Sequence, residues 1–260
     1  MQLHFYKYQG TGNDFIIFDN RTNEYNSLTA DQIRRLCDRR FGIGADGLML
    51  LNEKADYDFE MKYYNADGGE SSMCGNGGRC MTLFAYHLGI HRSMYKFLAI
   101  DGPHEAEIDT DGTISLKMKD VTEIKKMHGD SILDTGSPHY VKVVSDVMTL
   151  DVNKKGHELR YSKEFEKEGI NVNFVEQISE DKIIVRTYER GVECETYSCG
   201  TGVVAAALVC YHNENGFNEV EVKTLGGSLS IEFNRVDENK FEEIWLCGPA
   251  EKVYEGTIEL

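Results

Sequence analysis

The sequence predicts an α+β protein with two pseudo-symmetric domains, each a mixed sheet or partial barrel wrapped around a central helix. The motif E-x-x-x-C-G-x-G occurs at Glu70 and again at Glu195. In both halves strand-like stretches precede the motif, and an apolar stretch long enough for a helix follows it. A repeat of this length is typical of duplicated domains rather than of a solenoid. Strands that enclose one buried helix, twice over, make an α+β fold.

Further matches at spacings of 124 or 125 residues support the duplication. They pair Tyr63 with Tyr188, Tyr86-His87 with Tyr211-His212, Thr11-Gly12 with Thr135-Gly136, and Gly102 with Gly226. The boundary between the halves falls near residues 118–130. We assign residues 1–118, with a C-terminal strand at about 250–260, to the half that contains Cys74. Residues 119–249 form the half that contains Cys199.

The elements of the first half follow in order from local patterns. Strands are expected at 4–9 and 15–20, and then a helix at 29–40 with Thr29 as its N-cap. Two more strands, at 47–52 and 58–65, precede the central helix at 79–89. A hairpin at 108–118 closes this half, because Asp111-Gly112 is a typical hairpin turn.

The second half repeats this layout with strands at 139–144, 173–178 and 182–189. Its central helix, at 203–213, is almost wholly apolar, so we expect it to be buried on all sides. A hairpin at 228–246 with a polar turn at its centre closes the half.

Composition excludes several classes of protein. The net charge of −16 and the pI near 4.9 argue against a nucleic-acid partner and against an anionic membrane surface. No window of 18 residues is continuously apolar, and the first 15 residues lack the features of a signal peptide. We therefore expect a cytoplasmic location and no membrane segment. Seven cysteines without a C-x-x-C pair favour neither a disulfide scaffold nor a metal site.

Cys74 and Cys199 carry the strongest chemical signal. Each directly precedes Gly-x-Gly at the predicted start of a helix. Backbone N–H groups there have no partner within the helix, and the helix dipole is positive at that end. Both effects favour a thiolate over a thiol, and the glycines allow close approach of a bound anion. Structural burial of two cysteines is the alternative interpretation, which the equivalence of the two positions disfavours.

Two equivalent thiols suit the inversion of a carbon centre. A thiolate removes a proton from one face, and a thiol delivers another to the opposite face. The helix ends would bind the α-carboxylate of the substrate and stabilise the developing carbanion. The sequence therefore predicts a racemase or epimerase with acid–base thiols.

The chain resembles the diaminopimelate epimerase family. The resemblance rests on an ordered set of motifs from the first strand to the C-terminus: GTGNDF (10–15), FGIGADG (41–47), YNADGGESSMCGNGGRC (64–80), GSPHYV (136–141), YERGVECETYSCGTG (188–202) and CGPAEKVYEG (247–256). It implies a cofactor-independent and pyridoxal-phosphate-independent isomerase that interconverts LL- and meso-2,6-diaminopimelate, in lysine and peptidoglycan precursor biosynthesis. Diaminopimelate is then the expected small-molecule partner, and a homodimer is a possible assembly.

The resemblance also implies roles for particular residues. In the LL-to-meso direction Cys74 accepts the proton and Cys199 donates it, while His139 and Glu189 tune the thiols. The substrate-binding positions are Asn13, Asn65, Gly75, Asn76, Asn171, Glu189, Arg190, Gly200 and Thr201. Gly47 and Ser137 depart from the usual family pattern of Gln and Asn, which puts contacts to the distal end of the substrate in question.

Two other functions stay open on the sequence. A proline or hydroxyproline racemase-like enzyme shares paired cysteines before glycines, although GTGNDF, Asn76 and YERG favour the epimerase. From a different class, a non-catalytic zinc or redox thiol protein would use Cys194, Cys199 and nearby histidines.

Overall fold

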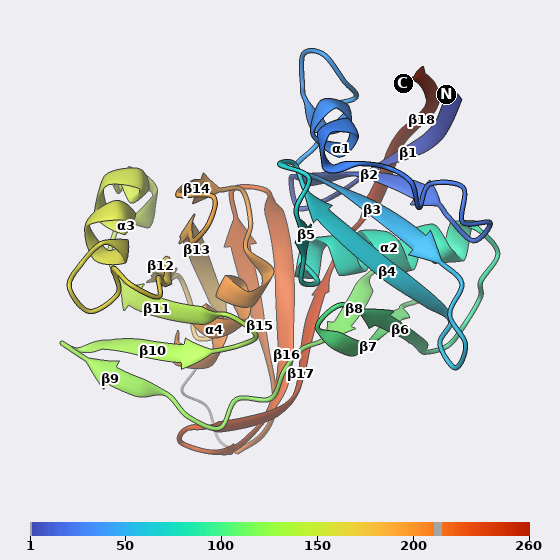
Figure 1. Cartoon of the computed structure of the whole chain (residues 1–260). Coiled ribbons are helices and arrows are strands. Elements are labelled where there is room, and N and C mark those ends of the chain that lie inside the picture. The colour runs from blue at the N-terminus through green and yellow to red at the C-terminus, as the bar shows by residue number, and fades with distance from the viewer. Residues whose placement is uncertain (1, 211–214) are drawn as a thin grey trace. The chain divides into compact units, whose positions relative to one another are not determined.

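The computed structural model describes residues 2–210 and 215–260 (Figure 1). Its contacts divide the chain into two compact units. The first comprises Met1–Leu116 and Gly248–Leu260, and the second comprises Lys117–Cys247. The pair Tyr211-His212 and the last residues of the helix expected at 203–213 lie outside the described residues.

The first unit is a sheet with one helix on each face. Its strands follow the spatial order β18–β1–β2–β3–β4–β6–β7–β8, and β5 also pairs with β4. These strands are β1 (Gln2–Gly10), β2 (Asn13–Asp19), β3 (Gly47–Asn52), β4 (Phe59–Asn65), β5 (Glu70–Ser71), β6 (Tyr95–Ala99), β7 (Gly102–Ile108), β8 (Ile114–Lys117) and β18 (Glu251–Glu259). The helices are α1 (Ala30–Cys37) and α2 (Gly75–His87).

The second unit has the spatial order β9–β10–β11–β12–β13–β15–β16–β17, and β14 also pairs with β13. Its strands are β9 (Lys125–Met127), β10 (Asp130–Asp134), β11 (Pro138–Val143), β12 (Asn171–Gln177), β13 (Lys182–Glu189), β14 (Cys194–Thr196), β15 (Gly216–Thr224), β16 (Gly227–Asp237) and β17 (Lys240–Gly248). Its helices are the short η1 (Val147–Thr149), α3 (Val152–Arg160) and α4 (Gly200–Cys210).

Strand pairing shows the duplication directly. From β1 to β8 the sheet pairs antiparallel, parallel, antiparallel, parallel, antiparallel and antiparallel. From β10 to β17 it pairs in the same way. A helix joins the first parallel pair in each unit, α1 between β2 and β3 and α3 between β11 and β12. The predicted α+β class is confirmed.

The register corrects one of the repeat matches. Met49 and Asn173 are counterparts, since each lies nearest to a Cβ built on the last glycine of its C-G-x-G motif. Met49 lies opposite Tyr63, and Asn173 lies opposite Thr187. Tyr63 therefore corresponds to Thr187, and the predicted match with Tyr188 is wrong by one residue. A shift of one residue turns a side chain to the other face of a sheet.

The central helices are enclosed by their sheets. Residues 75–82 of α2 are all buried, and α2 packs against β1, β2, β3, β7 and β18. In α4, Thr201 and Val209 are half-buried and the other residues are buried. This helix packs against β10, β11, β12, β13, β15 and β16. The prediction of burial around α4 is confirmed for the part of the helix that the structure describes.

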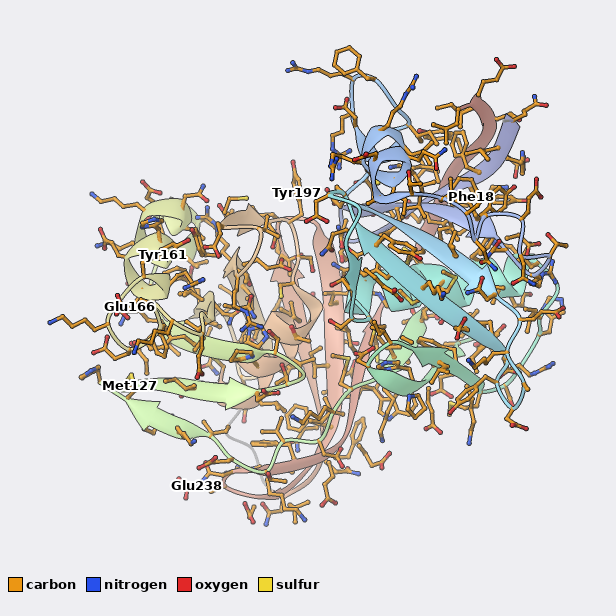
Figure 2. All side chains as sticks on the ribbon, in the orientation of Figure 1. Phe18, Met127, Tyr161, Glu166, Tyr197 and Glu238 are labelled. Carbon is orange, nitrogen blue, oxygen red and sulfur yellow. The ribbon has the colours of Figure 1, made fainter. Side chains whose placement is uncertain are left out.

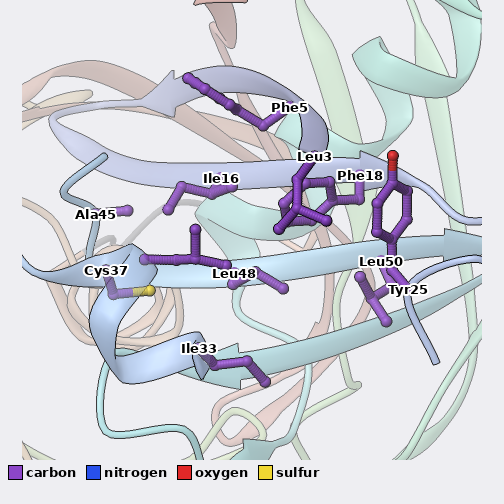
Figure 3. Packing of buried hydrophobic residues seen from close by; sticks show 11 residues of the cluster. Leu3, Phe5, Ile16, Phe18, Tyr25, Ile33, Cys37, Ala45, Leu48 and Leu50 are labelled. Carbon is purple, nitrogen blue, oxygen red and sulfur yellow. The ribbon is translucent and has the colours of Figure 1, made fainter. Parts of the chain in front are cut away.

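The outer face of each sheet is covered as well. In the first unit α1 places Ile33, Leu36 and Cys37 against Ile16 and Leu48 (Figure 3). Thr29 closes a capping box with Gln32, as its predicted N-cap role requires. Every residue of β3 is buried, because helices cover both faces of the sheet there.

The closing hairpins have the expected turns. Asp111 and Gly112 lie in the loop between β7 and β8, and Gly112 has a φ of +91°. Asp237 pairs with Lys240, so Glu238 and Asn239 form the polar turn between β16 and β17 (Figure 2).

Helix α3 depends on a glycine that local propensity disfavours. A Cβ built on Gly156 would lie 2.3 Å from Tyr188 Cβ and 2.5 Å from its Cγ. Gly156 therefore lets α3 lie directly on β13.

Gly156→Ala should destabilise the protein by about 1–3 kcal/mol through overpacking. Helix propensity alone would instead stabilise it by about 1 kcal/mol. Urea unfolding of the variant, with Lys154→Ala at an exposed position of α3 as control, measures the difference. A variant as stable as the parent would show that the close approach of α3 to Tyr188 is not required.

Candidate active site

Cys74 and Cys199 occupy the same position at the start of a helix. The carbonyl oxygen of Cys74 accepts the first helical hydrogen bond from Gly78 N at 2.7 Å, and that of Cys199 accepts one from Val203 N at 2.9 Å. Each cysteine is thus the residue before the first turn. Neither helix has an acidic residue in that turn. The positive end of each helix dipole is therefore not neutralised by a carboxylate of its own first turn.

A threonine from a strand connection anchors each helix start. Thr11 Oγ1 donates to Asn76 Oδ1 at 3.2 Å, and Thr135 Oγ1 donates to the carbonyl oxygen of Thr201 at 2.8 Å. Asn76 and Thr201 are equivalent, since each is the second residue after its cysteine. The repeated Thr-Gly pairs of the sequence thus have the same structural role in both halves. Thr11 holds a φ of +48°, an uncommon conformation for threonine.

One asparagine lies beside the Cys74 sulfur, and a second asparagine binds the first. Asn13 Oδ1 lies 3.6 Å from Cys74 Sγ and accepts a hydrogen bond from Asn76 Nδ2 at 3.4 Å. Asn76 Oδ1 also accepts from the fully buried Arg79, at 3.0 Å from Nη2. Asn76 is therefore held in one orientation, and it helps to position the Asn13 carbonyl oxygen at the thiol.

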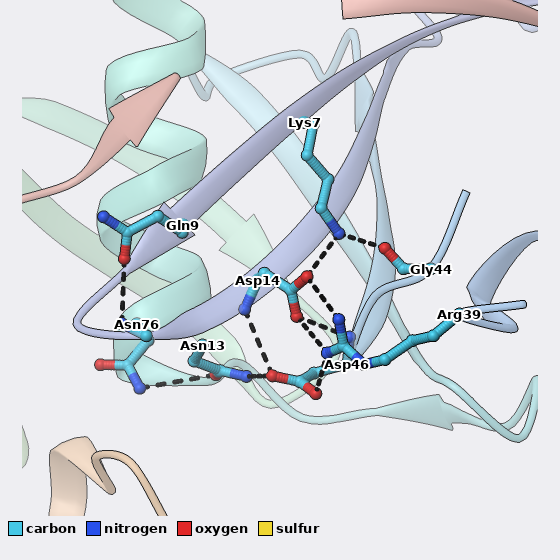
Figure 4. A network of polar contacts seen from close by, with 9 residues as sticks. Lys7, Gln9, Asn13, Asp14, Arg39, Gly44, Asp46 and Asn76 are labelled. Atoms are coloured by element: carbon cyan, nitrogen blue, oxygen red, sulfur yellow. Dashed lines mark hydrogen bonds and ion pairs between the residues drawn. The ribbon is translucent and has the colours of Figure 1, made fainter. Parts of the chain in front are cut away.

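An ion cluster behind Asn13 fixes that orientation (Figure 4). Asn13 Nδ2 donates to Asp46 Oδ2 at 2.6 Å, and Arg39 binds both Asp46 and Asp14. Lys7 Nζ lies 2.6 Å from Asp14 Oδ2 and also donates to the Gly44 carbonyl. Burial opposes the charged form of Asp14, but hydrogen bonds and charges from Arg39 and Lys7 outweigh it and lower the pKa of Asp14 to about 2. Asp14 is thus an anionic anchor at neutral pH.

A histidine lies behind the Cys199 sulfur. Thr201 Oγ1 is 3.6 Å from Cys199 Sγ and 2.9 Å from His139 Nε2. Burial lowers the pKa of His139 to about 3, against the opposing effect of the Asp134 charge. The imidazole is therefore neutral at physiological pH. It is placed to act on the thiol through the Thr201 hydroxyl.

Asn171, Ser137 and Arg190 form a second polar group in the same unit. Asn171 Nδ2 donates to Ser137 Oγ at 2.9 Å, and Asn171 Oδ1 accepts from Arg190 N at 2.9 Å. The guanidinium of Arg190 donates to Ser137 Oγ at 3.3 Å and to the Glu168 carbonyl at 3.1 Å. The exposed Arg190 side chain is thus positioned by Ser137, one of the two residues that depart from the family pattern.

The other departure has a steric explanation. A Cβ at Gly47 would lie 2.4 Å from Tyr63 Cε2 and 2.7 Å from the carbonyl oxygen of Tyr64. The ring of Tyr63 occupies the space that a longer side chain at this position would need.

The remaining expected residues lie at element ends. Gly75 and Gly200 are the buried first residues of α2 and α4. Asn65 is exposed at the end of β4, where its backbone closes the turn to Gly68 and Gly69. Glu189 is half-buried at the end of β13, where its charge adds to the effect of burial in raising the pKa of Cys194.

Sequence reasoning missed the residues that support the site. These are Thr11 and Thr135, Arg79, Asp46 and Asn173. The repeat of the Thr-Gly pair was a usable signal for the two threonines. In the part of the chain that the structure describes, no three His, Cys, Asp or Glu side chains are grouped to hold a metal ion, and no helix could span a membrane.

Solved structures share this fold along the whole chain. A phenazine biosynthesis protein of the PhzF family from Bacillus anthracis has a TM-score of 0.77 at 15% identity, with 100% of both chains covered. A hydroxyproline epimerase from Agrobacterium vitis has a TM-score of 0.68 at 11% identity, covering 100% of this chain and 93% of the other. The protein therefore has the two-domain α+β fold that these proteins share.

Sequence comparison gives the family within that fold. The family described as "Diaminopimelate epimerase" matches residues 5–124 and 131–253. A diaminopimelate epimerase of Flavobacterium psychrophilum is 47% identical over 98% of this chain and 100% of its own length. That of Chlorobaculum tepidum is 43% identical over 96% and 99%. The chain belongs to the diaminopimelate epimerase family.

Buried neutral His139 should make the protein sensitive to acid. An unfolded histidine titrates near pH 6.5. Because the folded pKa is about 3, only the unfolded state binds this proton between those values, so the free energy of unfolding falls as pH drops through that window. Urea unfolding at about pH 7 and about pH 4.5 should show a smaller decline for His139→Gln than for the parent. Equal declines would show that His139 does not contribute to the acid sensitivity.

Proposed function

We propose that this protein interconverts LL-2,6-diaminopimelate and meso-2,6-diaminopimelate without a cofactor. The observation that carries the proposal is a pair of cysteines at equivalent helix starts in a member of the diaminopimelate epimerase family. Relatives named for that activity match nearly the full chain, which supports the assignment of substrate.

The proposed reaction is a two-base proton transfer. In the LL-to-meso direction the Cys74 thiolate takes the α-proton, and the C–H electron pair stays on carbon as a carbanion. The Cys199 thiol then gives its proton to the opposite face, which leaves Cys74 as thiol and Cys199 as thiolate. The reverse reaction uses the same groups with their roles exchanged.

The helix starts supply the charge stabilisation. Amides of Gly75 and Asn76 on one side, and of Gly200 and Thr201 on the other, would bind the α-carboxylate as negative charge develops beside it. His139 and Glu189 tune the thiols. Since the His139 imidazole is neutral, it acts as a hydrogen-bonding group and not as a cation.

The distal amino-acid end would be held by polar side chains. Asn13, Asn65, Asn171 and Arg190 are the proposed contacts. The planar guanidinium of Arg190 can bind both oxygens of the distal carboxylate. Ser137 would hold that guanidinium in place, while Asn171 holds the backbone N–H of the same residue.

The wider setting is part of the same proposal. The enzyme would work in the cytoplasm, in lysine and peptidoglycan precursor biosynthesis, with diaminopimelate as its small-molecule partner. It would bind neither nucleic acid nor a membrane, and we propose that it assembles as a homodimer.

A proline or hydroxyproline racemase-like activity is the second candidate, favoured by the shared fold of the hydroxyproline epimerase. Assays of the purified chain on LL-diaminopimelate, proline and hydroxyproline, with no added cofactor, separate the two. A non-catalytic zinc or redox thiol protein would be inactive on all three, and elemental analysis would then find stoichiometric zinc in the zinc-binding case.

Cys74→Ala and Cys199→Ala should each lower turnover of LL-diaminopimelate by about 10³-fold or more while leaving the fold intact, because neither thiol can reach the other's face of the substrate carbon. Circular dichroism checks the fold. Cys210→Ala is the matched control, since burial raises the pKa of this thiol to about 12 and keeps it out of acid–base work. Near-normal turnover in either single variant would rule out the two-base mechanism.

Arg190→Lys should raise the KM for diaminopimelate about tenfold, because a point charge replaces a two-oxygen contact worth about 1.4 kcal/mol. Steady-state kinetics measure this change. Arg92→Lys, at an exposed ion pair with Asp58 in the other unit, is the control. An unchanged KM would remove Arg190 from the substrate site.

A further inference from the structure

The register allows the two halves to be compared position by position. Phe15 lies opposite Gly47 in the parallel pair β2–β3, and His139 lies opposite Asn171 in the equivalent pair β11–β12. Met49 is nearest to a Cβ built on Gly77, and Asn173 is nearest to one built on Gly202, so these two residues correspond. The shared register then matches His139 with Phe15.

The first half fills these positions with apolar side chains. Around a Cβ built on Gly77, the nearest atoms are Met49 Sδ at 3.2 Å, Met61 Cε at 3.4 Å and Phe15 Cζ at 3.5 Å. The second half places His139 and Asn173 at the positions of Phe15 and Met49, and Thr187 at the position of Tyr63; all three are buried. Because the first half packs apolar side chains at these positions, its polar counterpart is not a requirement of the fold. Buried polar groups cost free energy unless fully paired, so this group calls for a functional reason.

Asn173 has one possible orientation. Its Nδ2 lies 3.1 Å from the carbonyl oxygen of Tyr140, which can only accept a hydrogen bond. Its Oδ1 accepts from Thr187 Oγ1 at 2.9 Å. The second hydrogen on Nδ2 therefore points at His139 Nδ1, 3.0 Å away.

This orientation determines which imidazole nitrogen carries the proton. Nδ1 must accept from Asn173, so neutral His139 carries its proton on Nε2. Nε2–H then donates to Thr201 Oγ1 at 2.9 Å. The charged groups that act on His139 are Asp134, which favours the imidazolium, and Arg190, which opposes it.

The tautomer in turn determines what Thr201 offers to the sulfur. With Oγ1 accepting from His139, the Thr201 hydroxyl keeps its own proton for Cys199 Sγ, 3.6 Å away. The hydroxyl can donate to a thiolate, and its second lone pair can accept from a thiol. In the other tautomer the hydroxyl proton would go to Nε2, and the thiolate would lose this donor.

Gly202 is needed for this arrangement. A Cβ at this position would lie 2.3 Å from Asn173 Oδ1. The last glycine of the motif at Cys199 thus makes room for the amide that orients the histidine.

We propose that Asn173 is a positioning residue that fixes the Nε2–H tautomer of His139 and so directs the Thr201 hydroxyl proton to the Cys199 sulfur. This inference rests on the proposed role of Cys199 in proton transfer. As a result, Thr201 can form a hydrogen bond with Cys199 both as a thiolate and as a thiol. A group that accepts a proton in one direction and donates it in the other needs both.

The tautomer can be measured in the unmodified protein. Nitrogen NMR of protein with isotopically labelled histidine distinguishes a protonated ring nitrogen from an unprotonated one. At neutral pH, His139 should carry hydrogen on Nε2 and none on Nδ1, with His139→Gln serving to assign the signal. A protonated Nδ1 would overturn the proposal, whether or not the protein is an epimerase.

The effect on sulfur needs a double-variant experiment. In a Cys74→Ala background, iodoacetamide labelling of Cys199 is followed against pH by peptide mass mapping. Asn173→Leu should shift the midpoint of labelling upward by about half to one pH unit, since the thiolate loses part of a hydrogen bond. In a Thr201→Val background the same substitution should cause no further shift.

Asn218→Leu, at another buried asparagine of the same unit, should leave the midpoint unchanged. An unchanged midpoint in folded Asn173→Leu would overturn the proposal, and so would an equal shift with and without Thr201. Because labelling needs no turnover, failure of the proposed epimerase activity would appear separately, in the substrate assay.

Discussion

The starts of α2 and of α4, where helix geometry offers the backbone amides no acceptor within the helix, are the feature on which the rest of the site depends. A cysteine before each helix and a glycine-rich first turn place a sulfur at the helix N-terminus, the end that favours a bound anion. The strands around each helix bury most of its length, the first residue included. The Thr-Gly pairs then tie those starts to the sheet, through Thr11 in one half and Thr135 in the other.

Duplication explains why the two sites are alike, and later divergence explains why they differ. Around Cys74, Asn13 presents a carbonyl oxygen that is oriented by Asp46 and by the cluster of Lys7, Asp14 and Arg39. Around Cys199, a hydroxyl is oriented by a histidine and an asparagine. The same backbone therefore supports two different hydrogen-bonding environments for two thiols that both serve as acid–base groups. An enzyme that removes a proton from one face of a carbon and adds a proton to the other could use these different environments for its two thiols.

The sequence predicted the elements whose signal is local and missed those that depend on packing. Thr29 and the Asp111-Gly112 turn were readable because a cap and a turn are specified by neighbouring residues. Helix α3 was missed because Gly156 lowers its propensity, although Asp151 offered an N-cap signal. The helix is stabilised instead by its packing against Tyr188, a contact that exists only once the sheet has folded.

The candidate site likewise contains residues that the sequence could indicate and residues that only the fold brings together. The cysteines and glycines follow from the repeated motif, but the buried Arg79 could not be predicted, because arginine is usually exposed and its partners lie in three separate segments. Asn173 could have been predicted from the sequence, since it lies two residues from Asn171 on one strand and so shares its face. What the sequence could not show is that its amide meets His139, a contact set by strand register.

The most direct test of the account is the fate of the α-hydrogen in heavy water. If two different thiols serve the two faces, the first meso-diaminopimelate formed from LL-diaminopimelate in D₂O should carry deuterium at the inverted carbon. The unreacted LL-diaminopimelate should stay undeuterated over the same interval. Mass spectrometry of the separated isomers at early times measures both. Protium retained in the first product, or deuterium appearing equally fast in the remaining substrate, would indicate one shared base and would contradict the account.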